Sequence, residues 1–387
     1  MNSSFKIIVV LFLTVLLNAC KEKKMWETNG LPQTDEPRIT NLSYADGFSI
    51  SNQSGFAVLE VKTPWPEAKK TYRYALIPKE MAARITLNRD EFDGMIITPV
   101  KSIVVTSTTH IPALELLEVE DRLVGFPGTD YISSQSTRKR IDNGSVRELG
   151  QNESINTEVM LELNPNVVVA FGVNGSSKSL DLIEKAAIPV IYNGDWTESS
   201  PLGKAEWIKF FGALFDKEAK ADSIFKDIEK NYIEAKTAVM DKGQKPTVLS
   251  GALHQDAWYL PNGNSPEATL LKDAGLDYLW SHTSGNGSLA LSFESVLDKA
   301  KDADLWISPS YYNSKEALLN ASGLYGNFKA FQQDRIYSFS NKKGETGGVI
   351  YYELGTARPD LVLKDLIKIA HPEALPDYQM TFFEQLR

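Results

Sequence analysis

Apolar side chains recur at the spacing of an α-helix between Pro201 and Asp241. No Gly or Pro interrupts the chain between Ala213 and Asp241. This part can therefore form one helix of about 25 residues, roughly 37 Å long at 1.5 Å per residue. The apolar positions form two blocks: Trp207, Phe210, Phe211, Leu214 and Phe215, then Ile224, Phe225, Ile228, Tyr232, Ala235 and Val239.

Apolar strands alternate with helical segments on both sides of this helix. A helix followed by a Pro or Ala, an Asn or Asp, and an apolar strand occurs at Leu163–Ala170 and again at Ala300–Ile307. Such alternation predicts parallel sheets covered by helices on both faces. We therefore predict an α/β fold in which two Rossmann-like lobes with parallel sheets are joined by one long helical spine. The alternative is a surface helix on one large domain.

The segment from Ile39 to Pro78 has a different pattern, with apolar and polar residues alternating at period two. Turn residues interrupt it at Asn52–Gly55 and Pro64–Lys70. This pattern predicts a small antiparallel sheet as an N-terminal extension, to which we assign no chemistry. The patterns together divide the chain into a signal segment at 1–20, a tether at 21–38, the β-rich extension at 39–99, an N-terminal lobe at 100–200, linking helices at 201–243 and a C-terminal lobe at 244–387.

The beginning of the chain has the features of an export signal. Lys6 precedes the apolar run Ile7–Leu17, which is too short to span a bilayer. The run leads into Cys20, the only cysteine in the chain, in a setting that resembles a bacterial lipoprotein cleavage site. We predict that Cys20 is lipidated and that the protein is anchored on the extracytoplasmic, periplasmic side of a bacterial membrane. A plain membrane anchor or a cleaved signal is the alternative.

Charge and motifs exclude several classes of function. The formal net charge is −9 and basic residues are interspersed with acidic ones, so we expect no nucleic-acid partner. No second apolar stretch reaches about 18 residues, which leaves the lipid anchor as the expected membrane contact. The chain has no P-loop, GxSxG or HExxH motif, and we predict that it is not an enzyme and has no cofactor of its own. A lipoprotein enzyme and an adhesion scaffold remain as alternatives from other classes.

From Lys101 to the C-terminus, the order of motifs resembles a known family. The motifs are KSIVVTSTTHIPALELLEVEDRLVGFPG, VRELGQNESINTEVMLELNPNVVVAFG, the spine, NSPEATLLKDAGL, LALSFESVLDKAKDADLWI and DRIYSFS. This order is similar to that of the substrate-binding proteins of bacterial ABC importers for iron siderophores, haem and cobalamin. The resemblance implies a monomer that binds a metal chelate between its lobes and delivers it to a permease with ATPase subunits. A ferric siderophore is the first candidate cargo, with cobalamin or haem and a free metal ion as alternatives.

The resemblance also implies a docking surface. In this family, one exposed glutamate on each lobe binds arginines of the permease. The matching residues are Glu158, in the INTEVMLELNPNVVVA motif, and Glu294, in LSFESVLDKAKDADLWI. The sequence departs from the family at Asn166, where Asp is usual, and at Ala303, where Pro is usual. The alternative is that both glutamates have no docking role and occur in the first turns of helices because the helix dipole favours acidic residues there.

Candidate cargo contacts follow from the position of ligands in parallel α/β folds, beyond the carboxyl ends of the strands. Aromatic residues flanked by small polar groups suit a large, flat, partly apolar ligand. Trp196 and Trp258 are the first candidates because each follows a polar turn. The full set is Thr109, Tyr131, Asn174, Trp196, Trp258, Tyr259, Tyr311 and Tyr312, with Arg138 and Arg358 as groups that could bind an anionic cargo.

Two histidines could contact a metal directly. His110 and His254 each follow a predicted strand, one in each lobe, so they could meet across the cleft. Relatives that bind bare zinc or manganese use several histidines with a carboxylate and often a histidine-rich loop. This sequence has four histidines and no such loop, so we expect a chelated metal in preference to a free ion.

Overall fold

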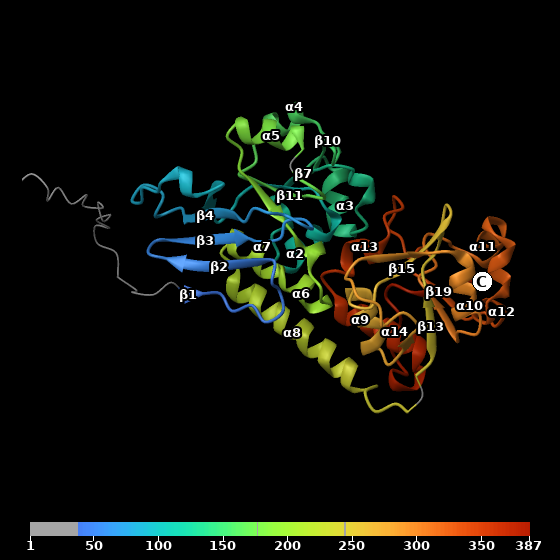
Figure 1. The fold of residues 1–387 in the computed structure, drawn as a ribbon. Helices are drawn as coiled ribbons and strands as arrows, with labels where there is room; N and C mark the ends of the chain where they lie inside the picture. Colours follow the sequence, from blue (N-terminus) through green and yellow to red (C-terminus); the bar gives the residue numbers. More distant parts are fainter. Residues whose placement is uncertain (1–37, 176, 244) are drawn as a thin grey trace, which may run out of the picture. The chain divides into compact units, whose positions relative to one another are not determined.

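The computed structural model describes residues 38–387 except 176 and 244 (Figure 1). The predicted signal segment, Cys20 and nearly all of the predicted tether lie outside the described residues. Within them the chain is a mixed α/β protein with two mainly parallel sheets and a mainly antiparallel N-terminal sheet. Among the described residues, no helix is both long enough and apolar enough to cross a membrane.

The N-terminal lobe is built on a five-stranded sheet of order β12-β11-β6-β7-β8, in which all neighbours are parallel. Its central strands are rich in valine and fully buried, as expected where helices cover both faces of a sheet. The strands are β6 (Ile103–Val105), β7 (Leu123–Phe126), β8 (Arg147–Glu148), β11 (Val167–Phe171) and β12 (Val190–Asn193), and the helices are α2 (Ile111–Leu116), α3 (Gln135–Asp142), α4 (Thr157–Leu163) and α5 (Lys178–Lys185). A small hairpin, β9 (Gly150–Gln151) and β10 (Ser154–Ile155), follows β8.

The C-terminal lobe has the sheet order β16-β13-β18-β19-β20, parallel except for the antiparallel end strand β20. A separate antiparallel sheet of order β14-β15-β17 lies in the same lobe. The strands are β13 (Thr247–Ser250), β14 (Ala252–His254), β15 (Ala257–Pro261), β16 (Asp277–Tyr278), β17 (Ser288–Leu291), β18 (Leu305–Ile307), β19 (Ile336–Ser338) and β20 (Glu384–Gln385). The helices are α9 (Pro266–Asp273), α10 (Phe293–Ala300), α11 (Lys315–Ala321), α12 (Lys329–Gln332), α13 (Ile350–Leu354) and α14 (Pro359–Ala370).

Three helices link the lobes: α6 (Pro201–Glu206), α7 (Ile208–Leu214) and α8 (Glu218–Thr237). The longest, α8, has 20 residues and is therefore about 30 Å long, shorter than the predicted helix. The chain leaves helical geometry at Asp216, whose φ is +54°. Figure 1 shows α8 extending toward the C-terminal lobe, where it packs on α14, while α7 packs on its first turns.

The N-terminal extension is a five-stranded sheet of order β1-β2-β3-β4-β5. Its first four strands pair antiparallel as predicted, but β5 is parallel to β4 because a crossover joins them. The strands are β1 (Arg38–Ile39), β2 (Phe48–Gln53), β3 (Phe56–Val61), β4 (Tyr72–Pro78) and β5 (Gly94–Thr98). One hydrophobic cluster runs from Phe48 of the extension through Phe210 of α7 to Leu249 of the C-terminal lobe.

Two buried glutamates, one in α6 and one just before it, fasten the extension to this part of the chain. The Glu206 carboxylate accepts hydrogen bonds from the main-chain nitrogens of Ser43, Tyr44 and Ala45 at 2.8–3.1 Å and pairs with Lys209 at 2.9 Å. Glu198 accepts from the main-chain nitrogens of residues 46 and 47 in the same way. Because removing such groups from water is costly unless they are fully bonded, these contacts fix the extension to α6.

Candidate functional site: the cleft between the lobes

The loops that follow the strands of the two parallel sheets face each other, and two of the cavities between them have walls rich in aromatic side chains. The smaller cavity has a volume of about 570 Å³ and the larger one about 1010 Å³. Both volumes are in the range of sites that hold cofactors and drug-sized ligands. Both cavities are lined by residues of the two lobes, as expected for a site at the carboxyl ends of parallel strands.

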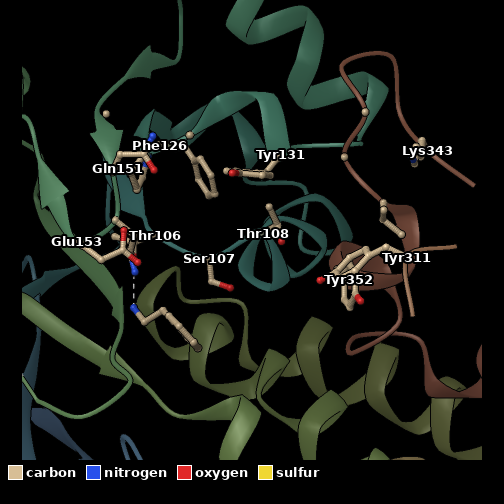
Figure 2. Close-up of a pocket in the computed structure, with 18 of the residues that line it drawn as sticks. Thr106, Ser107, Thr108, Phe126, Tyr131, Gln151, Glu153, Tyr311, Lys343 and Tyr352 are labelled. Atoms are coloured by element: carbon tan, nitrogen blue, oxygen red, sulfur yellow. Dashed lines mark hydrogen bonds between the residues drawn. The ribbon is translucent and has the colours of Figure 1, made fainter. Parts of the chain in front are cut away.

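The smaller cavity lies between loops after β6 and β7 and the C-terminal lobe (Figure 2). Figure 2 shows Phe126 and Tyr131 on one side and Tyr311 and Tyr352 on the other. Tyr131 and Tyr311 are 66% and 71% exposed, so these rings are open to a ligand. Hydroxyl and amide groups between the aromatic rings come from Thr106, Ser107, Thr108, Gln151 and Ser340.

The larger cavity lies on the other side of Tyr352, which lines both. Its walls carry many aromatic and aliphatic side chains, with hydroxyl, amide and charged groups among them. The N-terminal lobe contributes Trp196, which packs on Phe171 of the smaller cavity with ring centroids 5.6 Å apart. The C-terminal lobe contributes Tyr259, Leu260, Leu270, Leu271, Ile307, Phe339, Tyr351, Val362, Leu366 and Phe383. The pair Phe171 and Trp196 thus stands at the boundary between the two cavities.

Charged groups are sparse in this cleft. Among the described residues, the cations that line the cavities are Lys343 in the smaller one and Lys204 in the larger one, and no arginine lines either. The acidic lining residues are Glu67, Glu153, Glu198 and Glu267. The cleft therefore does not offer the excess of positive charge that would offset a highly anionic ligand.

The lobes touch beside the smaller cavity through a buried carboxylate. Glu353 of α13 accepts hydrogen bonds from the main-chain nitrogens of Ser133 at 2.6 Å and Ser134 at 2.9 Å, at the start of α3. Burial raises the pKa of Glu353 to about 7, and the nearby Glu115 adds to the rise. Close by, a Cβ added to Gly348 would lie 2.2 Å from the carbonyl oxygen of Tyr131, so the loop before α13 needs a glycine here.

The structure brings four of the ten predicted cargo residues to the two cavities. Tyr131 and Tyr311 line the smaller cavity, and Trp196 and Tyr259 line the larger one. Thr109 lines a separate internal cavity of about 20 Å³ beside Asp195. Asn174 is exposed but lines none of these cavities, and Tyr312 is half-buried with its ring against Tyr325.

Trp258 lies in the core instead of the cleft, which corrects the prediction. Its side chain is 0% exposed, its indole nitrogen donates to the carbonyl oxygen of Ser250 at 2.9 Å, and its ring packs on Trp306. The physical reason is that Trp258 belongs to β15, where successive side chains point to opposite faces. Tyr259, the next residue, therefore faces the cavity while Trp258 faces the core.

The two predicted arginines are also engaged within the fold. Arg138 is buried and donates to the carbonyl oxygen of Thr129 at 2.7 Å. Arg358 forms a bidentate pair with Asp360, with both contacts at 2.8 Å. Neither lines a cavity, so neither is placed to bind an anionic cargo.

The two histidines do not meet across the cleft. His110 is 0% exposed beneath the N-terminal lobe's loops, where it packs on Phe211, and burial lowers its pKa to about 3. His254 is exposed at the end of β14 and lines neither cavity. In the part of the chain that the structure describes, no group of three or more His, Cys, Asp or Glu side chains could hold a metal ion.

The two predicted docking glutamates are exposed on different lobes. Glu158 lies in the first turn of α4 and Glu294 in the first turn of α10. The N-terminus of α4 is capped by the side chain of Asn156, and that of α10 by the side chain of Ser292. The helix ends therefore do not need the glutamates as caps.

Sequence reasoning missed three parts of the cleft. These are Tyr352 in α13, the glycine-rich loop that carries Lys343, and Trp65 in the loop between β3 and β4. The clustered glycines at Gly344, Gly347 and Gly348 were the available signal for a close approach of the lobes. No local pattern marks Trp65, because its contacts are with residues far away in the sequence.

Comparison with known proteins identifies the class. The model of the family described as periplasmic binding protein matches residues 103–342, most of the chain. The chain therefore belongs to the periplasmic binding protein family, whose members bind solutes and are not enzymes. An uncharacterized lipoprotein of Methanocaldococcus jannaschii is 27% identical over 295 residues, which cover 74% of this chain and 68% of that protein.

Solved structures agree in fold. A periplasmic heme-binding protein from Pseudomonas aeruginosa has a TM-score of 0.56 at 17% identity, covering 74% of this chain and 98% of that one. The triscatecholate siderophore-binding protein FeuA from Bacillus subtilis, solved with ferri-bacillibactin, has a TM-score of 0.53 at 20% identity, covering 70% and 94%. These likenesses establish the two-lobe fold.

Proposed function

We propose that this protein captures a metal chelate of low net charge between its lobes and delivers it to the permease of an ABC importer. The observation that carries the proposal is the cleft itself, in which aromatic rings from both lobes surround two cavities at the carboxyl ends of the parallel strands. Such walls suit a large, partly apolar ligand. The similar fold of heme-binding and siderophore-binding proteins supports the same cargo class.

The charge of the cleft ranks the candidate cargoes. A ferric tris-catecholate carries a charge of about −3, and burying it without cationic partners is unfavourable. Two lysines and no arginine line the described cavities, beside several glutamates. These groups favour a neutral ferric siderophore, such as a trihydroxamate, or a corrinoid such as cobalamin. Haem, with two carboxylates, ranks below them, and a bare ion below haem because no ligand cluster is present among the described residues.

Delivery would use the exposed Glu158 and Glu294 as contacts for basic residues of the permease. Their position on separate lobes suits a partner that contacts both lobes at once. Anchoring through Cys20 would keep the protein beside its permease, in line with a lipoprotein among its relatives.

The test is a binding titration of the chain that begins at Lys21. The ligands are a neutral ferric trihydroxamate, a ferric tris-catecholate, haem, cobalamin, Zn²⁺ and Mn²⁺. Binding is measured by tryptophan fluorescence and by calorimetry. Saturable binding of a chelate, strongest for a neutral one, is expected. Trp196→Phe should reduce the quenching because Trp196 lines the larger cavity. Binding of bare ions alone, or of no ligand in the panel, would contradict the proposal.

A further inference from the structure

The larger cavity is not made by the two lobes alone. The loop between β3 and β4 of the N-terminal extension also lines it, through Thr63 and the run Trp65–Ala68. The family match begins only at residue 103, so this wall lies outside the part of the chain that defines the family. We propose that this loop, with Trp65 as its main contact, is part of the cargo site and determines which chelates fit. The inference rests on the proposed function and deepens it.

The loop is fixed against the cleft by close main-chain contacts. Thr197, beside Trp196, donates its hydroxyl to the carbonyl oxygen of Thr63 at 3.0 Å. A Cβ added to Gly194 would lie 2.2 Å from the same oxygen, far inside van der Waals contact. Gly194 directly follows β12, so a glycine at this strand end is what allows the loop to reach the cleft.

A second glycine makes room for the Trp65 ring. A Cβ added to Gly172, which directly follows β11, would lie 2.9 Å from Trp65 Cε3. The carbonyl oxygen of Gly172 also accepts the indole N–H of Trp196 at 3.2 Å. Trp65 and Trp196 thus both contact Gly172, and both line the larger cavity.

The Trp65 ring also packs against two tyrosines. Its centroid lies 5.8 Å from that of Tyr72 and 5.2 Å from that of Tyr192, both with edge-to-face geometry. Edge-to-face pairs of this kind hold an aromatic ring in one orientation. The ring is nonetheless only half-buried, which leaves part of it for a ligand.

The extension is also attached at a second place, away from the Trp65 loop. The loop between β1 and β2 donates main-chain hydrogen bonds to the buried carboxylates of Glu206 in α6 and of Glu198 just before α6. A preformed aromatic wall costs less ordering on binding than a mobile loop would. The ligand class that fits is a chelate large enough to extend past the pair Phe171 and Trp196 into the larger cavity, with an apolar, uncharged flank for Trp65.

The rival interpretation is that Trp65 only stabilises the extension. The experiment compares Trp65→Ala, Trp65→Phe and a control, Phe56→Ala, by calorimetric binding and thermal unfolding. Phe56 is an aromatic residue of the same sheet that pairs with Phe92 and lines neither cavity. The ligands are the chelates that the wild-type protein binds in the panel above.

Trp65→Ala should raise the Kd at least tenfold, Trp65→Phe should keep it within about threefold, and Phe56→Ala should leave it unchanged. The loss in Trp65→Ala should be larger for cobalamin-sized chelates than for smaller ones, which a purely structural role would not produce. A Kd unchanged in Trp65→Ala, with the wild-type protein binding normally, overturns this inference alone. A wild-type protein that binds no chelate overturns the proposed function together with it.

Discussion

The carboxylate of Glu353, in the C-terminal lobe, accepts a hydrogen bond of 2.6 Å from the main-chain nitrogen of Ser133, in the N-terminal lobe. This contact joins two residues 220 positions apart and closes the cleft beside the smaller cavity. A buried carboxyl group at this place makes the contact between the lobes dependent on pH.

The first prediction concerns that pH dependence. Burial raises the pKa of Glu353 to about 7 from its ordinary 4.5. Between these two pH values, the folded protein therefore holds a proton on Glu353 that the unfolded chain has lost. The stabilisation from this group is complete below pH 4.5 and is lost as the pH rises through about 7. Its size is up to about 3 kcal/mol, from roughly 1.4 kcal/mol per unit of pKa.

The measurement is thermal unfolding of the wild-type protein and Glu353→Gln between pH 5 and pH 8.5. Gln does not titrate and provides one acceptor for two N–H donors, so at pH 5 we expect it to be less stable than the wild-type protein by about 1–2 kcal/mol for the lost hydrogen bond. The difference between the two proteins should shrink as the pH rises. Glu115, which accepts hydrogen bonds from the hydroxyls of Ser134 and Thr137, is present in both proteins. A difference independent of pH would contradict the prediction.

A second prediction concerns Glu206, which binds the extension to α6. Glu206→Ala leaves three main-chain N–H groups without their acceptor and removes the nearer of the two carboxylates that pair with the 7%-exposed Lys209, at 2.9 Å compared with 3.4 Å for Asp222. Breaking a buried ion pair from one side costs about 3–5 kcal/mol. Chemical unfolding should show this loss. The matched control is Glu229→Ala, which removes a partly exposed acceptor of the Tyr44 hydroxyl and should cost less than about 1.5 kcal/mol.

A third prediction separates the two tryptophans that the sequence singled out. Trp258→Phe should lower stability by about 1–3 kcal/mol, because it removes the hydrogen bond to Ser250 and leaves a gap against Trp306. The affinity for cargo should not change. Trp196→Ala should do the reverse, with weaker cargo binding and a smaller loss of stability, because Trp196 lines the larger cavity. Calorimetric binding and thermal unfolding of both variants decide the matter.

A fourth prediction tests docking. Glu158→Ala combined with Glu294→Ala should abolish transport and leave the Kd for cargo unchanged, because both side chains are exposed and line neither cavity. Uptake by cells and calorimetry on the purified protein measure the two effects. The control is Glu162→Ala with Asp298→Ala, exposed acids later in the same two helices, which should transport normally. A large loss of cargo affinity in the double variant would show that the assignment is wrong.

The fold was predictable because helix and strand periodicity is local. The valine-rich β11 and the helical pattern around Phe225 each report burial over a few neighbouring residues. The break before α8 was not predictable in this way. The apolar pattern continues through Phe215, and only the close contact of Gly212 with Ala221 shows why the chain turns at Asp216.

The site was less predictable than the fold because its contacts are distant in sequence. Trp258 and Tyr259 are adjacent aromatic residues of one strand, and the pattern does not reveal which face of β15 meets the cleft. The contact between Thr63 and Thr197 spans 134 positions. Strand ends could be located from the sequence, which is why Tyr131 and Trp196 were among the predicted residues. The position of Trp65 at the cleft instead depends on how the N-terminal sheet packs on the N-terminal lobe.

The attachment of the extension through Glu206 bears on how the protein should be produced. A recombinant chain trimmed to residues 103–342 would lack β2 and β3, whose side chains complete the hydrophobic core around α7. It would also lack α14, which packs along α8. The apolar faces uncovered at both cuts would promote aggregation, since large exposed apolar patches drive association. Expression boundaries should therefore be chosen from the packing and not from the extent of the family match. They should include the residues from Asn41 to the last strand.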